Sequence, residues 1–277
     1  MEGKLYIVAT PIGNLEDITI RAINVLKEAD LIAAEDTRHT LKLLNHLNIS
    51  KPLISYYKQN EKVKTDILIE KLKMGKNIAL VSDAGTPVIS DPGEEVIRVA
   101  IENNIEIVPI PGACALICGL ISSGLNAKEF SFIGFLSANK KEKMDKLNEI
   151  KNETKTLIFY EAPHKLLATL NCMLEVLGDR KICVARELTK IHEELIHGTI
   201  SEMISNIDEP KGEFVLIIEG SKKTANEEVI DNLNTLSLED HYKYYKEQGM
   251  DKKEIIKQIA KDRKVNKNDI YKHFMKK

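Results

Sequence analysis

The sequence predicts an α/β fold with two α/β domains and a small C-terminal helical module. Strand-like apolar runs alternate with helical patterns in residues 4–122, and a second series of the same kind follows in residues 130–218. The chain has 277 residues and is 43% hydrophobic, which is enough for each of two domains to bury its own core. We expect the domains at 1–124 and 125–222, and a linker with the helical module at 223–277.

In the first domain, each strand-like run is followed by a short helical pattern. The expected strands are 4–9, 31–34, 52–55, 77–81 and 105–110. The expected helices are 19–28, 37–47, 65–73 and 94–102. Because short crossovers favour parallel strands, we expect a mainly parallel sheet that is covered by helices on both faces.

Residues 107–127 contain no charged side chain, and their number alone would admit a membrane span. Two prolines and three glycines break this stretch into a strand, a turn and a short helix, so we expect no membrane span. The segment 122–129 is rich in small and polar residues and has the composition of an interdomain linker.

The second domain follows the same alternation with a more mixed sheet. The expected strands are 130–135, 156–160, 181–185, 195–200 and 213–218. A charged helix is expected at 140–151, and another helix begins at Pro163.

After a polar segment at 221–236, three helices are expected at 238–247, 251–261 and 266–275. Asp251 and Asn266 are candidate N-caps and Gly249 is a candidate helix stop. Three short helices with a basic surplus indicate a helix-turn-helix-like module. A charged bundle that only packs on the body of the protein is the alternative.

Charge is distributed unevenly along the chain, although the net charge is only −2. Residues 241–277 contain twelve Lys or Arg and five Asp or Glu, a net of +7, so residues 1–240 carry a net of −9. The tail is therefore the part expected to attract nucleic acid.

The four cysteines indicate no metal site, because they lack the paired spacing of structural zinc ligands. Cys114 and Cys118 are expected to be small packing residues. The N-terminal residues show no secretory signal, so we expect a reduced cytoplasmic setting.

Three loops with glycine or proline directly follow expected strands. They are TPIGN (10–14), SDAGTP (82–87) and PGACA (111–115). Such loops expose main-chain amides, and the carboxyl ends of parallel strands form the ligand crevice of an open sheet. We therefore expect a small molecule to be held here by main-chain atoms. The spacing matches neither a dinucleotide fingerprint nor a phosphate loop, which argues against NAD and ATP.

Charged residues also follow the strands. The segment AEDTRHT (34–40) is either a helix start capped by Asp36 or Thr37, or a polar wall that grips a hydroxylated, anionic substrate. The segments FYEAPHK (159–165) and ARELTK (185–190) place further charges at strand ends, where they face the crevice or pair with one another.

Taken together, these motifs resemble the ribosomal small-subunit methyltransferase I family of the tetrapyrrole-methylase superfamily. The matching segments, in order between about Lys4 and Gly220, are TPIGNLEDIT, AEDTRHT, ALVSDAGTP.ISDPG, PG.CA, GFL, TLIFYE..H, ARELTK and the closing GE.VLI.EG. Departures at Ala9, Ala113 and Ser137, where members often have proline, put only local loop shape in doubt.

The resemblance implies two α/β domains with S-adenosylmethionine in the cleft between them and a C-terminal helical module. It implies methylation of the ribose 2′-hydroxyl of cytidine 1402, in the decoding centre of 16S rRNA, within the 30S subunit. It also implies a homodimer in the cytoplasm. The residues implied to surround the cofactor are Pro11, Ala84, Gly85, Thr86, Ile89, Cys114, Ala115, Tyr160, Glu161 and Thr189.

The catalytic and substrate residues are hypotheses from position alone. Asp36 and Glu187 are candidate bases, with Arg186 and Arg38 holding phosphate or orienting the base. The polar wall that would bind the substrate consists of Glu35, Arg38 and His39.

Two alternatives keep parts of this interpretation. A small-molecule methyltransferase acting on a tetrapyrrole would need an apolar trough, whereas AEDTRHT offers charge. A non-catalytic protein that senses a nucleotide and binds nucleic acid would leave the polar strand ends of the second domain without a role.

Overall fold

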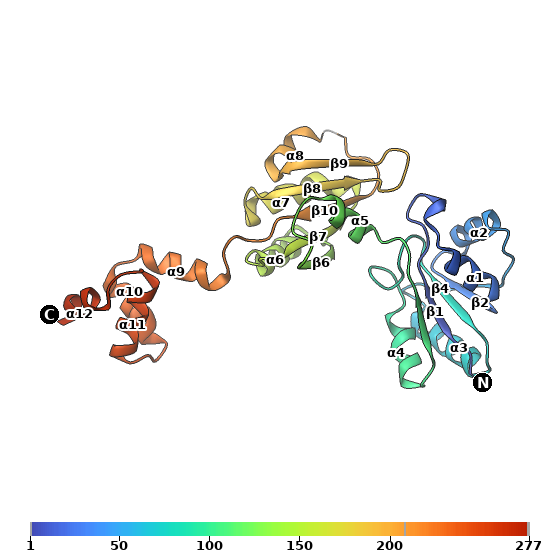
Figure 1. The fold of residues 1–277 in the computed structure, drawn as a ribbon, viewed down its shortest axis with the longest axis horizontal. Coiled ribbons are helices and arrows are strands. Elements are labelled where there is room, and N and C mark those ends of the chain that lie inside the picture. Colours follow the sequence, from blue (N-terminus) through green and yellow to red (C-terminus); the bar gives the residue numbers. More distant parts are fainter. Residues whose placement is uncertain (1, 208, 276–277) are drawn as a thin grey trace.

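The structure is a computed structural model that describes residues 2–207 and 209–275. Two sheets lie next to each other, and a helical module lies beyond the second sheet at the end of a connecting segment (Figure 1). The predicted α/β fold with C-terminal helices is confirmed. Lys276 and Lys277 of the basic tail lie outside the described residues.

The first sheet is entirely parallel, with strand order β3-β2-β4-β1-β5. Its strands are β1 (Leu5–Val8), β2 (Leu31–Ala34), β3 (Leu53–Ser55), β4 (Ile78–Val81) and β5 (Ile107–Ile110). Its helices are α1 (Ile20–Glu28), α2 (Thr37–His46), α3 (Glu61–Lys73) and α4 (Glu94–Glu102), with a 3₁₀ turn at Leu15–Asp17.

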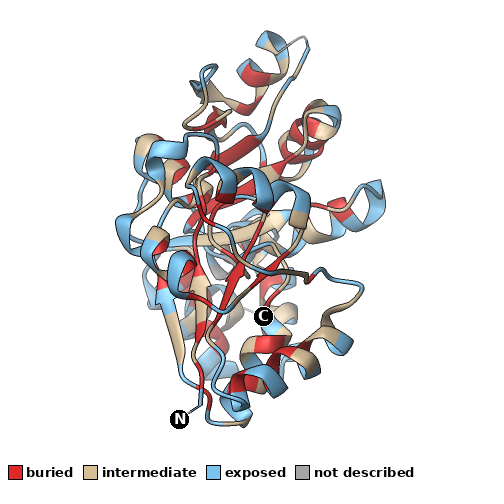
Figure 2. Cartoon of the chain, turned by 90° about the vertical axis from the view of Figure 1, so that its right-hand side faces the viewer, coloured by how far each residue is buried: buried red, intermediate tan, exposed pale blue. Residues whose placement is uncertain are grey.

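Apolar side chains alternate between the two faces of this sheet, as a pleated strand requires. Leu80 packs with α3 and α4 on one face, and Ala79 and Val81 pack with α1 and α2 on the other. All of β4 is buried for this reason, and buried residues concentrate on the strands and on the inner faces of the helices (Figure 2).

The second sheet is mixed, with strand order β6-β7-β10-β8-β9; only the β6–β7 pair is parallel. Its strands are β6 (Phe130–Phe135), β7 (Thr156–Glu161), β8 (Lys181–Arg186), β9 (Glu194–Thr199) and β10 (Phe214–Ile218). One face is covered by α6 (Lys140–Ile150), α7 (Leu166–Leu177) and α8 (Ile200–Asn206). A 3₁₀ turn at Pro163–Lys165 precedes α7.

The other face of the second sheet is covered by α5 (Ala115–Ser122). Leu116 and Leu120 of this helix pack with Ile158, Cys183 and Ile217 of the strands. The chain thus crosses to the second sheet before α5, ahead of the segment expected as a linker. The division into domains at residue 124 stays a prediction.

Two helices were not expected from the sequence. The strand expected at 195–200 ends at Thr199, because Thr199 and Glu202 form a capping box that starts α8. The polar segment 221–236 contains α9 (Ala225–Thr235), which begins with a capping box between Thr224 and Glu227. Both helices begin at side-chain hydrogen bonds, which the periodicity of apolar residues does not reveal.

The remaining helices of the module are α10 (Leu238–Glu247), α11 (Lys252–Asp262) and α12 (Lys267–Met275). Asp251 caps α11 as expected, and Gly249 follows α10 with a φ of +84°. Leu233 of α9 packs with Ile255 and Ile259 of α11, so α9 belongs to the core of this module.

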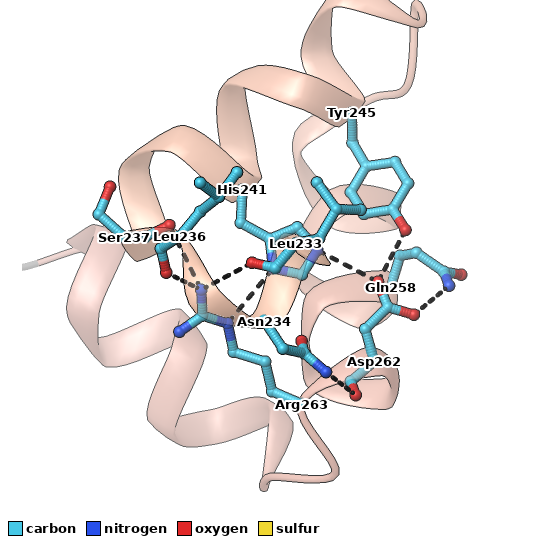
Figure 3. A network of polar contacts seen from close by, with 9 residues as sticks. All are labelled: Leu233, Asn234, Leu236, Ser237, His241, Tyr245, Gln258, Asp262 and Arg263. Carbon is cyan, nitrogen blue, oxygen red and sulfur yellow. Dashed lines mark hydrogen bonds and ion pairs between the residues drawn. The ribbon is translucent and has the colours of Figure 1, made fainter. Parts of the chain in front are cut away.

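Figure 3 shows a buried polar network at the centre of the module. The Asp262 carboxylate accepts hydrogen bonds from Tyr245 Oη at 2.7 Å and Gln258 Nε2 at 2.7 Å, and His241 Nε2 lies 3.3 Å away. Arg263 donates from Nε to His241 Nδ1 and from Nη2 to carbonyls near the end of α9. This network joins α9, α10 and α11 through directional contacts.

Candidate functional site

A cavity of about 450 Å³ lies between the carboxyl ends of the first sheet and one end of the second sheet. This volume falls within the range of about 300–1,000 Å³ that is typical of small-molecule sites. Eight of the ten residues expected around a cofactor line it: Ala84, Gly85, Thr86, Ile89, Cys114, Ala115, Tyr160 and Glu161. The other two, Pro11 and Thr189, are neighbours of Ile12 and Leu188, which line the cavity.

Backbone contacts tie the three loops of the first sheet together. Thr10 and Gly85 exchange two hydrogen bonds, of 2.9 and 3.1 Å, and Thr86 Oγ1 donates to the Ala113 carbonyl at 3.0 Å. Gly85 has a φ of +80°, and a Cβ there would lie only 3.0 Å from Ile12 Cγ2. Glycine is therefore required for both the conformation and the close approach of these loops.

The second sheet contributes an aromatic wall. Tyr160 at the end of β7 lies edge-on to Phe132 and Phe135, and its hydroxyl accepts a hydrogen bond of 3.1 Å from Leu116 N at the start of α5. Burial raises the pKa of Tyr160 to about 12, so the phenol stays protonated and available as a donor.

Five acidic residues line the cavity: Glu35, Asp83, Asp91, Glu161 and Glu213. Desolvation raises the pKa of Glu35 above its usual value, and repulsion from Asp91 and Asp83 adds to this. Desolvation also raises the pKa of Asp91, against a hydrogen bond from Ser82. Asp83 accepts a hydrogen bond of 2.9 Å from Asp36 N and so supports the loop after β2.

Asp36, Arg38 and His39 do not line the cavity. Asp36 caps α2, with Arg38 N at 2.8 Å and Arg38 Nη2 at 2.7 Å from its carboxylate. These hydrogen bonds from Arg38 hold the pKa of Asp36 well below its usual range. In this geometry AEDTRHT is a helix start capped by Asp36, one of the two interpretations of the sequence. Of the residues expected to bind the substrate, Glu35, Arg38 and His39, only Glu35 lines the cavity.

The ARELTK loop is held by its own charges. Glu187 Oε1 accepts from Lys190 Nζ and from Glu213 N, both at 2.9 Å, and the hydrogen bond from Lys190 lowers the pKa of Glu187. Arg186 donates to the Lys211 carbonyl at 2.9 Å and lies 3.3 Å from Glu194. Arg186, Glu187 and Lys190 thus pair with nearby groups and do not line the cavity, whereas Glu213, which pairs with Lys190, does line it.

Thr189 connects the two sheets. Its Oγ1 accepts a hydrogen bond of 3.1 Å from Asn14 N in the first loop, and its backbone has a φ of +66°. A non-glycine residue in this conformation is uncommon and marks a loop whose shape is imposed by its surroundings. The hydrogen bond from Asn14 N links the first loop of the first sheet to the loop after β8.

Several lining residues were not chosen from the sequence. Asp83 and Asp91 lie in SDAGTP and ISDPG, motifs recognised for their loops only, although two acidic residues at strand ends are themselves a signal. Phe135, Leu188, Phe214 and Val215 gave no signal, because nothing in their local pattern separates a lining residue from a core residue.

The residues fit S-adenosylmethionine. Apolar side chains such as Ile12, Ile89 and Val215 suit an adenine ring, while carbonyls and carboxylates of the loops suit hydroxyl and amino groups. Over 2–207 and 209–275 there is no group of three or more His, Cys, Asp or Glu placed to hold a metal ion. Within the same ranges no helix combines the length and apolarity that crossing a bilayer demands.

Comparison with known proteins supplies independent information. The family described as Tetrapyrrole (Corrin/Porphyrin) Methylases matches residues 4–204. A protein of Bacillus subtilis (strain 168), named ribosomal RNA small subunit methyltransferase I, is 50% identical over 271 residues, which cover 97% of this chain and 93% of that protein. The protein of the same name from Halalkalibacterium halodurans is 52% identical over 273 residues, covering 98% and 94%.

Solved structures resemble the chain in fold. Native uroporphyrin III C-methyl transferase from Thermus thermophilus matches with a TM-score of 0.56 at 15% identity, over 78% of this chain and 97% of that one. A diphthine synthase matches with a TM-score of 0.59 at 15% identity, over 79% and 90%. At this identity the likeness concerns the fold alone.

Proposed function

This chain belongs to the tetrapyrrole (corrin/porphyrin) methylase family and, within it, to the ribosomal RNA small subunit methyltransferase I proteins, and we propose that it methylates 16S rRNA in the 30S subunit. By its family the chain is a methyltransferase. We infer that the acceptor is the ribose 2′-hydroxyl of a decoding-centre cytidine. The observation that carries the proposal is the identity of about half of all positions with these relatives, which extends over nearly the whole chain.

S-adenosylmethionine is the proposed donor, and it would supply an electrophilic methyl group on a sulfonium. The ten residues expected to hold it lie in or beside the cavity, and hydrogen bonds tie the loops of the first sheet to one another. Fixing a donor and an acceptor in one orientation can contribute up to about 7–11 kcal/mol to lowering a barrier. The rigid loops therefore suit a reaction that needs alignment more than chemical assistance.

The ribose hydroxyl must also lose a proton, and a carboxylate near it is the natural acceptor. Asp36 and Glu187 stay candidates for this role, although each is held by a cation. Glu35 and Asp91 face the cavity and have raised pKa values, which makes them stronger bases. We propose that either Glu35 or Asp91 takes the proton.

RNA binding requires positive charge, which the body of the chain lacks on balance. We propose that the basic module, together with the Lys-rich segment at 140–146, in which Lys140 and Lys141 are exposed, attracts the ribosomal RNA. A homodimer, and action on ribosomal subunits in the cytoplasm, stay predictions that rest on the family.

The experiment that tests the proposal is transfer of a labelled methyl group from S-adenosylmethionine to unmodified 30S subunits, followed by mapping of the modified nucleotide. We expect label on one ribose of 16S rRNA in the decoding centre. Label on a base or on another RNA would disprove the acceptor, and no transfer to any ribosomal RNA would disprove the function. Subunits already methylated by a related enzyme are the matched control.

A further inference from the structure

Three buried polar side chains form a connected series behind the wall of the cavity. Glu161 at the end of β7, Thr169 in α7 and Lys143 in α6 are 2%, 0% and 3% exposed. A lysine is almost never this deeply buried without a specific partner, because desolvating its charge is costly. Of the three, only Glu161 lines the cavity.

The hydrogen bonds of this series run in one direction. Lys143 Nζ donates to Thr169 Oγ1 at 2.7 Å, and Thr169 Oγ1 donates to Glu161 Oε2 at 2.6 Å. An ammonium group can only donate hydrogen bonds, so the threonine oxygen accepts from Lys143. The single O–H of the threonine is then the donor to the Glu161 carboxylate. Glu161 Oε1 accepts from Ala162 N at 2.9 Å, so both of its oxygens are held as acceptors.

The position of the threonine between the two charges has a consequence for the cavity. Placed behind Thr169, Lys143 compensates the buried negative charge while each carboxylate oxygen keeps a lone pair for another donor. A fixed, desolvated carboxylate recognises hydrogen-bond donors more strongly than an exposed one does.

We propose that Lys143 and Thr169 are positioning residues that hold the Glu161 carboxylate as an acceptor for a hydroxyl or ammonium group of the methyl donor. This inference rests on the proposed function for the identity of the donor. Neither Lys143 nor Thr169 touches the cavity, so both act through Glu161.

The test is titration calorimetry of the full chain with S-adenosylhomocysteine, combined with thermal unfolding of each variant. Thr169→Val keeps the shape and removes the hydroxyl, and combined with Lys143→Met it also removes the buried lysine charge, so that Glu161 keeps only the hydrogen bond from Ala162 N. We expect the double variant to fold and to bind about tenfold more weakly or worse, as loss of a charge-assisted hydrogen-bond network implies.

Thr169→Ser gives the opposite pattern. It keeps the hydroxyl and removes a buried methyl group, so unfolding should occur at lower temperature while the affinity stays within about threefold of wild type. Lys141→Met, at an exposed position of the same helix, is the control for loss of a positive charge and should leave the affinity unchanged.

A second ligand distinguishes whether Glu161 binds a hydroxyl or the ammonium group. 5′-Methylthioadenosine keeps the ribose hydroxyls but lacks the ammonium group, so it loses affinity in the double variant only if Glu161 binds a hydroxyl. The inference would be overturned if wild type and the double variant bound S-adenosylhomocysteine with equal affinity. It would also be overturned if Thr169→Ser lost as much affinity as the double variant. Failure of the wild type to bind S-adenosylhomocysteine would instead disprove the proposed donor.

Discussion

Four carboxyl groups in or near the cavity fall into two sets according to their neighbours. Asp36 and Glu187 accept hydrogen bonds from Arg38 and Lys190, which lower their pKa values and fix their positions. Within the described ranges, Glu35 and Asp91 form no ion pair, and desolvation raises the pKa of both. The first set supports loops, and the second is suited to accept a proton.

This difference predicts the effect of neutral substitutions on turnover. We expect Asp91→Asn or Glu35→Gln to lower methyl transfer by roughly 10²–10⁴-fold, the usual contribution of a general base. Asp36→Asn and Glu187→Gln should act mainly on loop stability. Single-turnover rates, with S-adenosylhomocysteine affinity measured in parallel, distinguish these effects; a larger loss in Asp36→Asn than in Asp91→Asn would reverse the assignment.

The raised pKa values also predict the pH dependence. A base works when ionised, so the rate should fall as the pH drops through the raised pKa, above the usual carboxyl range of about 3.9–4.3. In the variant that lacks the base, this acidic limb should disappear from the pH profile of single-turnover rates. An unchanged limb in both Asp91→Asn and Glu35→Gln would exclude them.

Among the secondary-structure elements, α5 has the most direct influence on the cavity. It begins with Ala115 in the cavity wall and packs on the second sheet through Leu116 and Leu120. Gly119 permits this packing, because a Cβ there would lie 3.1 Å from Ile217 and 3.2 Å from Val215. The position of α5 therefore couples the packing of the second sheet to the shape of the site.

Gly119→Val should consequently push α5 away from β10. We expect a loss of stability of about 1–3 kcal/mol, as for other overpacked cores, and weaker binding of S-adenosylhomocysteine because Cys114 and Ala115 move with the helix. Denaturant unfolding and calorimetry measure the two effects. Ile121→Ala, at an exposed position of the same helix, is the control and should change neither.

The helices of the module depend on the network around Asp262. Burial lowers the pKa of His241, Arg263 adds to this, and Asp262 opposes it. Since the folded pKa is below the unfolded value of about 6.5, the unfolded module takes up a proton first as the pH falls. The module should therefore lose stability below about pH 6.5 and regain it above.

Hydrogen exchange of α10 and α11 at pH 7.5 and 5.5 tests this dependence. We expect faster exchange at the lower pH in the wild type and a smaller difference in His241→Gln. Tyr245→Phe, which removes one donor to Asp262, should destabilise the module by about 1–3 kcal/mol at both pH values. Equal pH dependence in wild type and His241→Gln would assign it to other groups.

Across the whole molecule, the helical module lies at the end opposite the first sheet (Figure 1), and residues 241–277 carry a net charge of +7. Lys253, Lys257 and Lys261 repeat every four residues along α11, so they lie on one face of that helix, and all three are exposed. No ion pair joins them to another residue of the described ranges. This face is therefore the best candidate for phosphate contacts.

Neutralising these three lysines with glutamine should weaken binding of 30S subunits and reduce the salt slope of log K by about 2–3, or roughly 0.7–0.9 per lost contact. Cofactor affinity should not change. The control is the same substitution at Lys62, Lys71 and Lys73, which are exposed on α3. An equal loss in both triple variants would remove any special role of α11.

Deletion of the module should begin at residue 223 and not at 238, because Leu233 of α9 is part of the module core. We expect the shortened chain to bind S-adenosylhomocysteine like the full chain and 30S subunits more weakly. Filter binding at several salt concentrations measures the loss. Equal affinity for subunits with and without the module would contradict its proposed role.

The sequence alone determined the order of the strands and of all helices except α8 and α9, the loops at the strand ends and the basic tail. These features are local, because periodicity, turn residues and charge can be read within a few residues of chain. Resemblance to a family supplied the cofactor residues, and eight of the ten line the cavity.

Only the tertiary structure decided which charged residues face that cavity and which pair with one another. It also placed α5 on the second sheet and connected Lys143 to Glu161 through Thr169. Each of these facts depends on contacts between residues far apart in the chain. No local pattern records such contacts, because they arise only when separate elements pack together.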